Sequence, residues 1–487
     1  MLKYCAVRLK GTISPLIAGS VIVFLLSAFS LGQYGFRGTL TLDDAIYLYG
    51  GQQMVQGTPP YQSAFDHKGP MTTILAATGI SVAHLLNFDE ILTVRVLFFA
   101  MGVLSSVGIF WLSALLFEAP QVGFLSAATF TTFWGFGSSA ASGPQAKTAM
   151  VLFMILALGL TINKKWFWAA FFGALAGLTW QPTFIFPILT IFLAGVQTPK
   201  GVERVKNVLK AVVGASVPVL AICTYFISER AFASFWDGLI LFNVKYLDQS
   251  NIVILDNIRR FRWAVQLKGF QTAGIPILMG FAALIIVFIW RYKLTKNSFR
   301  AWLQRDRFVV IFLSFPIPFV WSLLEFQGYP DFYIFLPYAA LGFGWFVYQA
   351  ISSIAGMLSL NPAAARSLLV LLISAVLVGA ATSHYRLTRN SELLAQRQWA
   401  HQVATAYGPQ ARILSINVPE ALVILNKSNP TPYVFIMRSI GDYTEATEPG
   451  GFEGWLARVE SVDPTVIFFR PVGEKYDAQI AKWLEVH

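Results

Sequence analysis

The segment Ile13–Leu31, ISPLIAGSVIVFLLSAFSL, contains no charged side chain and decides the class of fold. A helix of this length is long enough to cross the hydrocarbon layer of a bilayer, which is about 30 Å thick. Three basic residues precede it: Lys3, Arg8 and Lys10. This flank also fits a secretory signal peptide with a weak cleavage pattern at 28–30, but the apolar stretch is long for a signal h-region. The segment therefore predicts an uncleaved signal anchor whose N-terminus lies in the cytoplasm.

The same apolar pattern recurs along the chain. Hydrophobic residues make up 56% of the 487 residues and charged residues only 13%, whereas soluble proteins carry about 45–50% and about 25%. Further apolar runs lie at 92–117, 121–137, 145–162, 166–181, 183–197, 208–227, 272–290, 308–324, 331–350 and 367–384. With the first segment they predict an α-helical polytopic membrane protein with about eleven transmembrane helices. The stretch 70–86 is apolar but bounded by polar residues, and we interpret it as lying at the membrane interface.

Basic residues support this topology, because they gather in short loops on one predicted side. These are Lys164, Lys165, Lys200, Arg204, Lys206, Lys210, Arg291, Lys293, Lys296, Arg300, Arg305 and Arg307. Loops rich in Lys and Arg mark the cytoplasmic side of a membrane protein. The formal net charge of +11 is thus a topology signal, and it argues against a basic face that binds nucleic acid. One predicted outer loop, 228–271, breaks the rule with Arg259, Arg260, Arg262 and Lys268.

The composition becomes polar from about Tyr385 onwards. Apolar, strand-like runs at 412–416, 433–437 and 466–469 alternate with helix-like stretches at 419–425 and 452–459, which is typical of an α/β domain. We therefore divide the chain into a transmembrane domain at 1–384 and a small α/β domain at 385–487. An odd number of spans places the second domain outside the cytoplasm.

Three short motifs crowd the first outer loop. They are Thr41-Leu42-Asp43-Asp44-Ala45-Ile46-Tyr47, Gly57-Thr58-Pro59-Pro60-Tyr61 and Phe65-Asp66-His67-Lys68-Gly69-Pro70. The adjacent carboxylates Asp43 and Asp44 repel each other, which favours proton uptake by one of them and suits a group that deprotonates an attacking hydroxyl. The alternative is structural: Asp43 caps a helix that begins at Asp44. The sequence leaves both interpretations open.

Polar residues also gather at the predicted outer ends of the spans. They are Arg95, Lys147, Gln181, Asp237, Glu325, Gln327 and Asp331. Charged residues at such depths usually face a cavity or a partner. Because they share a side with the acidic loop, they predict a hydrophilic cavity open to the outer face. Its expected lining includes Tyr47, Tyr61, His67, Gln327 and Asp331. The alternative is that each side chain extends to its own interface.

Taken together, the acidic pair, the Tyr-bearing helix, the Gly-x-x-Pro-Tyr turn and the Asp-His-Lys-Gly-Pro segment resemble GT-C glycosyltransferases. The resemblance is to the branch containing protein O-mannosyltransferases and the aminoarabinose transferase of lipid A. The segment Phe326-Gln327-Gly328-Tyr329-Pro330-Asp331, followed by Phe335-Leu336-Pro337-Tyr338, is similar to archaeal-type dolichol-phosphate-mannose mannosyltransferases. The resemblance covers the chain from Ile13 to His384 and is only general in the tail.

This resemblance implies roles for four residues. Asp43 or Asp44 would accept the proton of the acceptor hydroxyl as it attacks the anomeric carbon, Asp66 matches the second acidic position, and Lys68 lies near the donor phosphate. The chain departs from the family at 66–70, where many relatives have Glu-Lys-Pro-Pro, and at 143–147, where some have an acidic residue. These departures leave the sugar and the acceptor open.

The outer basic cluster has two possible uses. Arg259, Arg260 and Arg262 alternate with Phe261 and Trp263, a combination that suits a lipid-linked phosphate at the membrane surface, because guanidinium groups bind phosphate bidentately and stabilise a departing anion. The other use is attraction to anionic lipid head groups. The same residue types fit both.

We expect no cofactor. The five histidines include no HxxxH or HExxH pair, and Cys5 and Cys223 lie on different segments and suggest neither a disulfide nor a metal site. His67 beside Asp66 is either a hydrogen-bonded loop histidine or a ligand of a divalent ion, so the sequence does not exclude a metal.

These features predict a membrane glycosyltransferase. The resemblance implies that it would move mannose or another hexose from a polyprenyl- or dolichyl-phosphate donor to an exported acceptor such as a lipid-linked glycan, with inversion. Its partners would then be this donor, the acceptor and membrane lipids. The main alternative is a polytopic transporter or lipid-sugar flippase, but transporters tend to carry internal repeats and charges near the midplane. A membrane-anchored scaffold would leave the acidic loop and the arginine cluster without a role.

Overall fold

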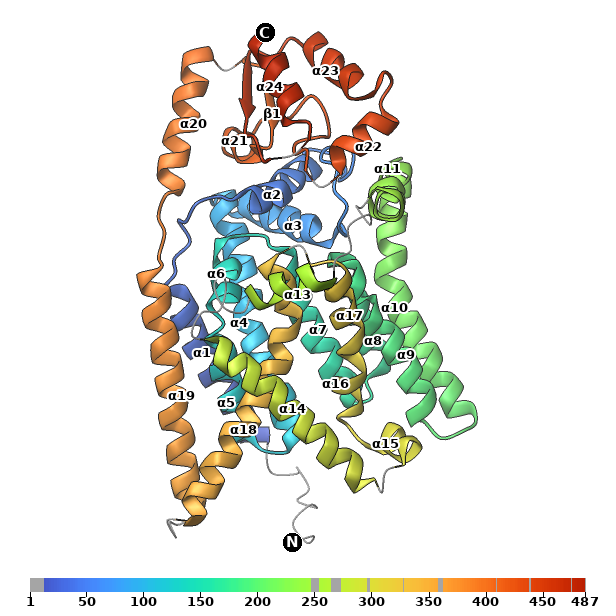
Figure 1. Cartoon of the computed structure of the whole chain (residues 1–487), viewed down its shortest axis with the longest axis vertical. Coiled ribbons are helices and arrows are strands. Elements are labelled where there is room, and N and C mark those ends of the chain that lie inside the picture. The colour runs from blue at the N-terminus through green and yellow to red at the C-terminus, as the bar shows by residue number, and fades with distance from the viewer. Residues whose placement is uncertain are drawn as a thin grey trace.

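The computed structural model describes residues 13–246, 254–263, 273–295, 298–326, 328–357, 362–408, 410–437, 439–473 and 475–486. The chain forms a tall helical bundle, a layer of two helices across one end of that bundle, and a small α/β unit on top of this layer (Figure 1). The bundle contains α1 (Ile13–Gly32), α4 (Glu90–Phe117), α5 (Pro120–Thr131), α6 (Trp134–Ser142), α7 (Ala146–Ile162), α8 (Trp166–Thr179), α9 (Ile185–Gln197), α10 (Val202–Ser228), α14 (Gly274–Leu294), α15 (Phe299–Arg305), α16 (Val309–Ser314), α17 (Pro316–Leu324), α18 (Leu336–Met357) and α19 (Pro362–Leu387).

Within the described residues, the apolar runs predicted from the sequence form helices, although the run 121–137 is divided between α5 and α6, and the multi-pass α-helical fold is confirmed. Within the described ranges, six helices are long and apolar enough to cross a membrane. The bent pairs α6–α7 (114°) and α15 with α16–α17 (104°) raise that number to eight if each pair forms one span. The remaining predicted runs form the shorter helices α5, α8 and α9, which account for the difference from about eleven.

Small residues let neighbouring helices of the bundle approach closely. A Cβ atom on Gly280 of α14 would lie 2.1 Å from the backbone oxygen of Ala339 on α18, and one on Gly342 would lie 2.0 Å from the oxygen of Gly280. Between helices in a bilayer the hydrophobic effect is weak, so association depends on packing of this kind. The α14–α18 contact therefore requires glycine at both positions.

The layer at the upper end of the bundle consists of α2 (Leu42–Val55) and α3 (Met71–Leu86), which run across the bundle axis (Figure 1). In α2 the residues from Asp44 to Gln53 are buried, because the bundle covers one side and the α/β unit covers the other. The first outer loop therefore lies in the middle of the fold.

The C-terminal unit contains α20 (Leu393–Tyr407), β1 (Ile413–Ile416), α21 (Pro419–Leu425), α22 (Ile440–Thr447), α23 (Gly451–Ser461), β2 (Val466–Phe469) and α24 (Asp477–Val486). Strands β1 and β2 are parallel, with Ile413 opposite Val466. The strand expected at 433–437 is wrong: this segment is buried but irregular, and Asn417 holds it by accepting from the Ile436 amide at 2.7 Å. Instead of forming a strand, this segment places its apolar side chains against α2.

Candidate active site

At the start of α2, the adjacent carboxylates of Asp43 and Asp44 have different surroundings. Thr41 is the N-cap, and its hydroxyl accepts from the Asp44 amide, so the expectation that Asp43 caps the helix is wrong. Asp44 is only 1% exposed; its carboxylate accepts from the Thr41 hydroxyl at 2.7 Å and from the Gln145 amide at 2.8 Å. Asp43 is exposed and lines a hollow of about 400 Å³.

Burial raises the pKa of the Asp44 carboxyl above its ordinary value, although the hydrogen bond from Thr41 and the charge of Arg95 oppose this. Arg95, fully buried on α4, donates to the backbone oxygens of Phe36, Gly38 and Thr39. It thereby fixes the segment that leads into α2. These contacts give Asp44 a structural role and leave Asp43 as the carboxylate that faces the hollow.

The opposite wall of the hollow is the loop 66–68, which three side chains hold in place. The amides of Gln181 and Asn243 both donate to the His67 backbone oxygen, at 2.6 and 2.8 Å. The Tyr61 hydroxyl donates to the Lys68 backbone oxygen at 2.6 Å. Tyr61 has φ 67°, an unusual conformation for a bulky residue. The bundle and the Pro-Tyr turn thus cooperate to position Lys68.

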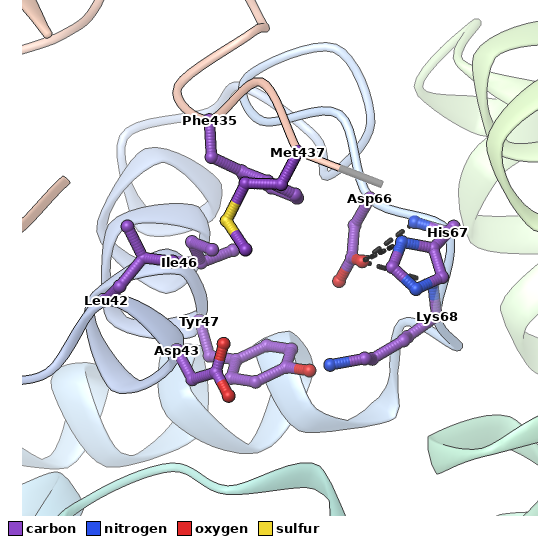
Figure 2. A pocket seen from close by; sticks show the side chains of 9 residues that line it. All are labelled: Leu42, Asp43, Ile46, Tyr47, Asp66, His67, Lys68, Phe435 and Met437. Carbon is purple, nitrogen blue, oxygen red and sulfur yellow. Dashed lines mark hydrogen bonds and ion pairs between the residues drawn. The ribbon is translucent and has the colours of Figure 1, made fainter. Parts of the chain in front are cut away.

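Figure 2 shows how the side chains of this first hollow face one another. Asp66 accepts from the backbone amides of His67 and Lys68, at 2.7 and 3.1 Å, and its side chain is 15% exposed. Lys68 extends across the hollow toward Tyr47, with which it hydrogen-bonds, and Asp43 lies beside them. One ammonium group therefore stands among two carboxylates and a phenol.

Burial also affects the protonation of the Asp66 and Tyr47 side chains. It raises the pKa of Asp66, while the Lys68 ammonium and the two backbone amides lower it. Burial raises the pKa of Tyr47 as well, so this phenol stays a neutral donor at physiological pH. The His67 ring lies 3.7 Å from Asp66, Nδ1 to Oδ1, and is buried.

The roof of the hollow comes from the C-terminal unit, through Phe435 and Met437 (Figure 2). The irregular segment reaches this place because the unit docks on the first loop. The Phe65 amide donates to the Pro432 oxygen at 2.8 Å, and the Asn429 amide donates to the Tyr49 hydroxyl at 2.9 Å. Sequence reasoning missed this roof, because only the tertiary fold brings residues so distant in sequence together.

A second hollow, of about 450 Å³, adjoins the first one at His67 and Lys68. Trp180, Gln181 and Pro182 line one side of it, and Asn243, Trp321, Glu325 and Asp331 complete the lining. Asp331 forms a buried ion pair with Lys147 at 2.9 Å, and the Lys147 ammonium lies 3.3 Å from the centre of the Trp180 ring. Lys147, Gln181, Glu325 and Asp331, expected at the outer ends of the spans, thus meet around this hollow.

The structure does not bring the arginine cluster to either hollow. Arg259, Arg260 and Arg262 are exposed on α13 (Ile254–Trp263), which is held by Asn257 donating to the backbone oxygens of α17. Arg259 pairs with the exposed Asp256 at 3.0 Å. Gln327 lies outside the described residues. Of the remaining candidates, Tyr61 lines a small side pocket shared with Asp66.

A metal site was left open by the sequence. Across the described part of the chain, no group of three or more His, Cys, Asp or Glu side chains is placed to hold a metal ion. Independently of any metal, the first hollow brings carboxylates close to an ammonium group, an arrangement that suits proton transfer beside a bound anion.

No protein-family model and no curated protein matches the sequence. Among solved structures, ArnT from Cupriavidus metallidurans in the apo state is similar with a TM-score of 0.56 and 13% identity over 86% of this chain and 84% of that chain. ArnT bound to undecaprenyl phosphate gives a TM-score of 0.53 and 13% identity over 87% and 86%. The Archaeoglobus fulgidus oligosaccharyltransferase tethered with an acceptor peptide gives 0.50 and 12% identity over 93% and 68%. The likeness shows that the chain shares its fold with these proteins.

Proposed function

Because the chain has the fold of GT-C glycosyltransferases, we propose that it is a membrane glycosyltransferase. It transfers a sugar, mannose or another hexose, from a polyprenyl-phosphate donor to a hydroxyl of an exported acceptor such as a lipid-linked glycan. The observation that supports this most strongly is the first hollow, where Asp43 faces the Lys68 ammonium across the Tyr47 side chain. ArnT from Cupriavidus metallidurans, which shares this fold, has been solved bound to undecaprenyl phosphate, a lipid of the same class as the carrier of the proposed donor.

In the proposed reaction, Asp43 on one side of the hollow activates the acceptor and Lys68 on the other side stabilises the leaving group. The Asp43 carboxylate accepts the proton of the acceptor hydroxyl, whose oxygen attacks the anomeric carbon of the donor. The bond from that carbon to the phosphate oxygen breaks, and the electron pair leaves with the polyprenyl phosphate. Lys68 stabilises this departing anion, since positive charge placed where negative charge develops lowers the barrier. Attack opposite the leaving group inverts the anomeric centre.

We assign the base to Asp43 and not to Asp44. The Asp44 carboxylate already accepts two hydrogen bonds and is covered by the helix and by Gln145, so no acceptor reaches it. Asp66 serves as a second carboxylate that holds Lys68 and orients the donor or acceptor. The Tyr47 hydroxyl and the His67 ring complete the lining.

The exposed arginines of α13 receive a different role. Since Arg259, Arg260 and Arg262 line neither hollow, we propose that they attract anionic lipid head groups near the mouth of the site. This choice leaves Lys68 as the phosphate ligand within the cavity.

We further propose that the two-helix layer and the C-terminal unit lie outside the cytoplasm, and that the domain division falls near residue 384. The basic loops support this orientation: α15 and the turn between α9 and α10 lie at the end of the bundle opposite the C-terminal unit (Figure 1). Basic loops are typical of the cytoplasmic side. The N-terminus of α1 lies at that same end.

The test is sugar transfer by the purified protein from a panel of polyprenyl-phosphate hexoses, with Asp43→Asn beside Asp44→Asn. We expect Asp43→Asn to lose transfer by about two to four orders of magnitude while still binding donor, which is the usual contribution of a general base. Asp44→Asn keeps the size of the side chain and one of its two accepting oxygens, and should retain most activity. Full activity of Asp43→Asn would refute the assignment, and lipid movement across vesicles without transfer would favour a flippase.

A further inference from the structure

The second hollow has a lining that the proposed chemistry does not use. Its two indole rings, Trp180 and Trp321, come from different parts of the bundle, and the carboxylates of Glu325 and Asp331 point to the same space together with the Gln181 amide.

The combination of these groups suits a sugar ring. Carboxylate and amide oxygens accept hydrogen bonds from hydroxyl groups. The negative face of the Trp321 indole ring attracts the weakly positive C–H groups on the apolar side of a pyranose, whereas one face of the Trp180 ring is covered by the Lys147 ammonium. An apolar lipid tail offers no hydrogen-bond donor to the carboxylates that line the hollow, whereas the hydroxyl groups of a sugar do. The hollow therefore fits a carbohydrate better than a polyprenyl chain.

The position of the hollow makes it the donor's subsite. Lys68, the proposed phosphate ligand, lines both hollows. Trp321 lies at the outer surface of α17 and is 38% exposed, so the hollow borders the region where a lipid-linked molecule would enter. A donor bound from that side would have its phosphate at Lys68 and its sugar next to it, while the first hollow would remain for the acceptor hydroxyl and Asp43.

The charges around the hollow select among sugars. Glu325, Asp331 and Lys68 line the hollow. Lys147 lies outside the lining but pairs with Asp331 at 2.9 Å, so two negative charges are matched by two positive charges. Because these charges balance, neither a cationic amino sugar nor an anionic uronate gains net attraction. We propose that the second hollow binds the neutral, hydroxyl-rich sugar ring of the polyprenyl-phosphate donor. This inference rests on the proposed function.

The experiment compares two lipids on the purified full-length protein in nanodiscs: undecaprenyl phosphate and the same lipid carrying a neutral hexose, with glucose, galactose and mannose tested in turn. Dissociation constants are measured by native mass spectrometry for the unmodified protein, Glu325→Gln and Trp321→Ala. Trp290→Ala is the matched control, since Trp290 is 52% exposed on α14 and lines neither hollow.

We expect the unmodified protein to bind at least one hexose-bearing lipid about tenfold or more tightly than the bare lipid, which corresponds to a few additional hydrogen bonds. Glu325→Gln and Trp321→Ala should bring that ratio toward one without changing the affinity for bare undecaprenyl phosphate, and Trp290→Ala should change neither. An aminohexose or a uronate on the same lipid should bind more weakly than the best neutral hexose.

Three results would overturn the inference. Equal binding of bare and hexose-bearing lipids by the unmodified protein would show that no sugar subsite exists, while leaving the proposed function intact. Equal losses for both lipids in Glu325→Gln and Trp321→Ala would place these residues at the phosphate or in the fold. Tighter binding of a charged sugar would refute the charge argument. Failure to bind any of the lipids would instead refute the proposed function, and with it this inference.

Discussion

The buried ion pair between Lys147 and Asp331 offers a quantitative test of how the site is built. Its nitrogen and oxygen atoms lie 2.9 Å apart, and the two side chains are only 6% and 8% exposed. At an effective dielectric constant of about 20, charges at this distance attract each other by about 6 kcal/mol, before the cost of their dehydration. Removing one partner of a buried pair typically costs about 3–5 kcal/mol, because the other charge is left buried and uncompensated.

We therefore expect Lys147→Met to lower the free energy of unfolding by about 3–5 kcal/mol. The double variant Lys147→Met/Asp331→Asn should recover at least about half of that loss, since the methionine keeps most of the packing on Trp180 and no charge remains buried. The control is Arg307→Met, which breaks the pair with Glu118, whose side chains are 45% and 61% exposed. Exposed pairs contribute about 0–1 kcal/mol.

The measurement is reversible unfolding in mixed micelles, in which a rising fraction of a denaturing detergent unfolds the protein and circular dichroism follows the helix content. A double variant as unstable as Lys147→Met would refute the electrostatic reasoning. The loss would then come from the contact between the lysine and the Trp180 ring, where the ammonium lies 3.3 Å from the ring centre. A loss in Arg307→Met equal to that in Lys147→Met would refute the importance of burial.

Two other predictions concern the first loop. Burial raises the pKa of Asp44, so the folded state binds this proton more tightly than the unfolded state does. The contribution of this group to stability is therefore fully present at low pH and is lost as pH rises through the raised pKa. Asp44→Asn should flatten the resulting fall in melting temperature between pH 4 and 8, and an unchanged pH profile would contradict this prediction. Gln181→Ala removes a 2.6 Å hydrogen bond to the His67 backbone oxygen and should weaken undecaprenyl phosphate binding by about three- to tenfold. Gln197→Ala, which loses a similar bond to the Leu303 oxygen far from the hollows, should not, and equal effects of the two would remove the link to the Lys68 loop.

The helical bundle is predictable from the sequence because length and hydropathy alone determine which segments can satisfy their backbone groups in a bilayer. The limits of the prediction are equally physical. The run 121–137 was expected to be one helix, but the chain breaks after Thr131 and restarts at Trp134. Such a break depends on contacts with distant segments, among them Tyr385, whose hydroxyl donates to the Thr131 backbone oxygen at 3.1 Å. The hydropathy of the sequence does not reveal that contact.

The candidate site was predictable only in part, and for a related reason. Asp66, His67 and Lys68 are consecutive, so their common position follows from the chain itself, and a short helix places Asp43 and Tyr47 one turn apart on the same face. Phe435 and Met437 reach the hollow only because the C-terminal unit docks on α2. From their residue types, Arg259, Arg260 and Arg262 were candidates either for the donor phosphate or for lipid head groups, but residue types do not determine position.

The choice between Asp43 and Asp44 shows why two adjacent carboxylates are useful here. Successive residues on an α-helix point about 100° apart, so they cannot face the same partner. The contacts of Asp44 with Gln145 and Thr41 fix the rotation of α2 about its axis, because turning the helix would bury an uncompensated carboxylate. That fixed rotation directs Asp43 into the hollow beside Lys68. In the proposed mechanism, Asp44 therefore orients the helix and Asp43 acts as the base, a difference that two identical side chains do not reveal in the sequence.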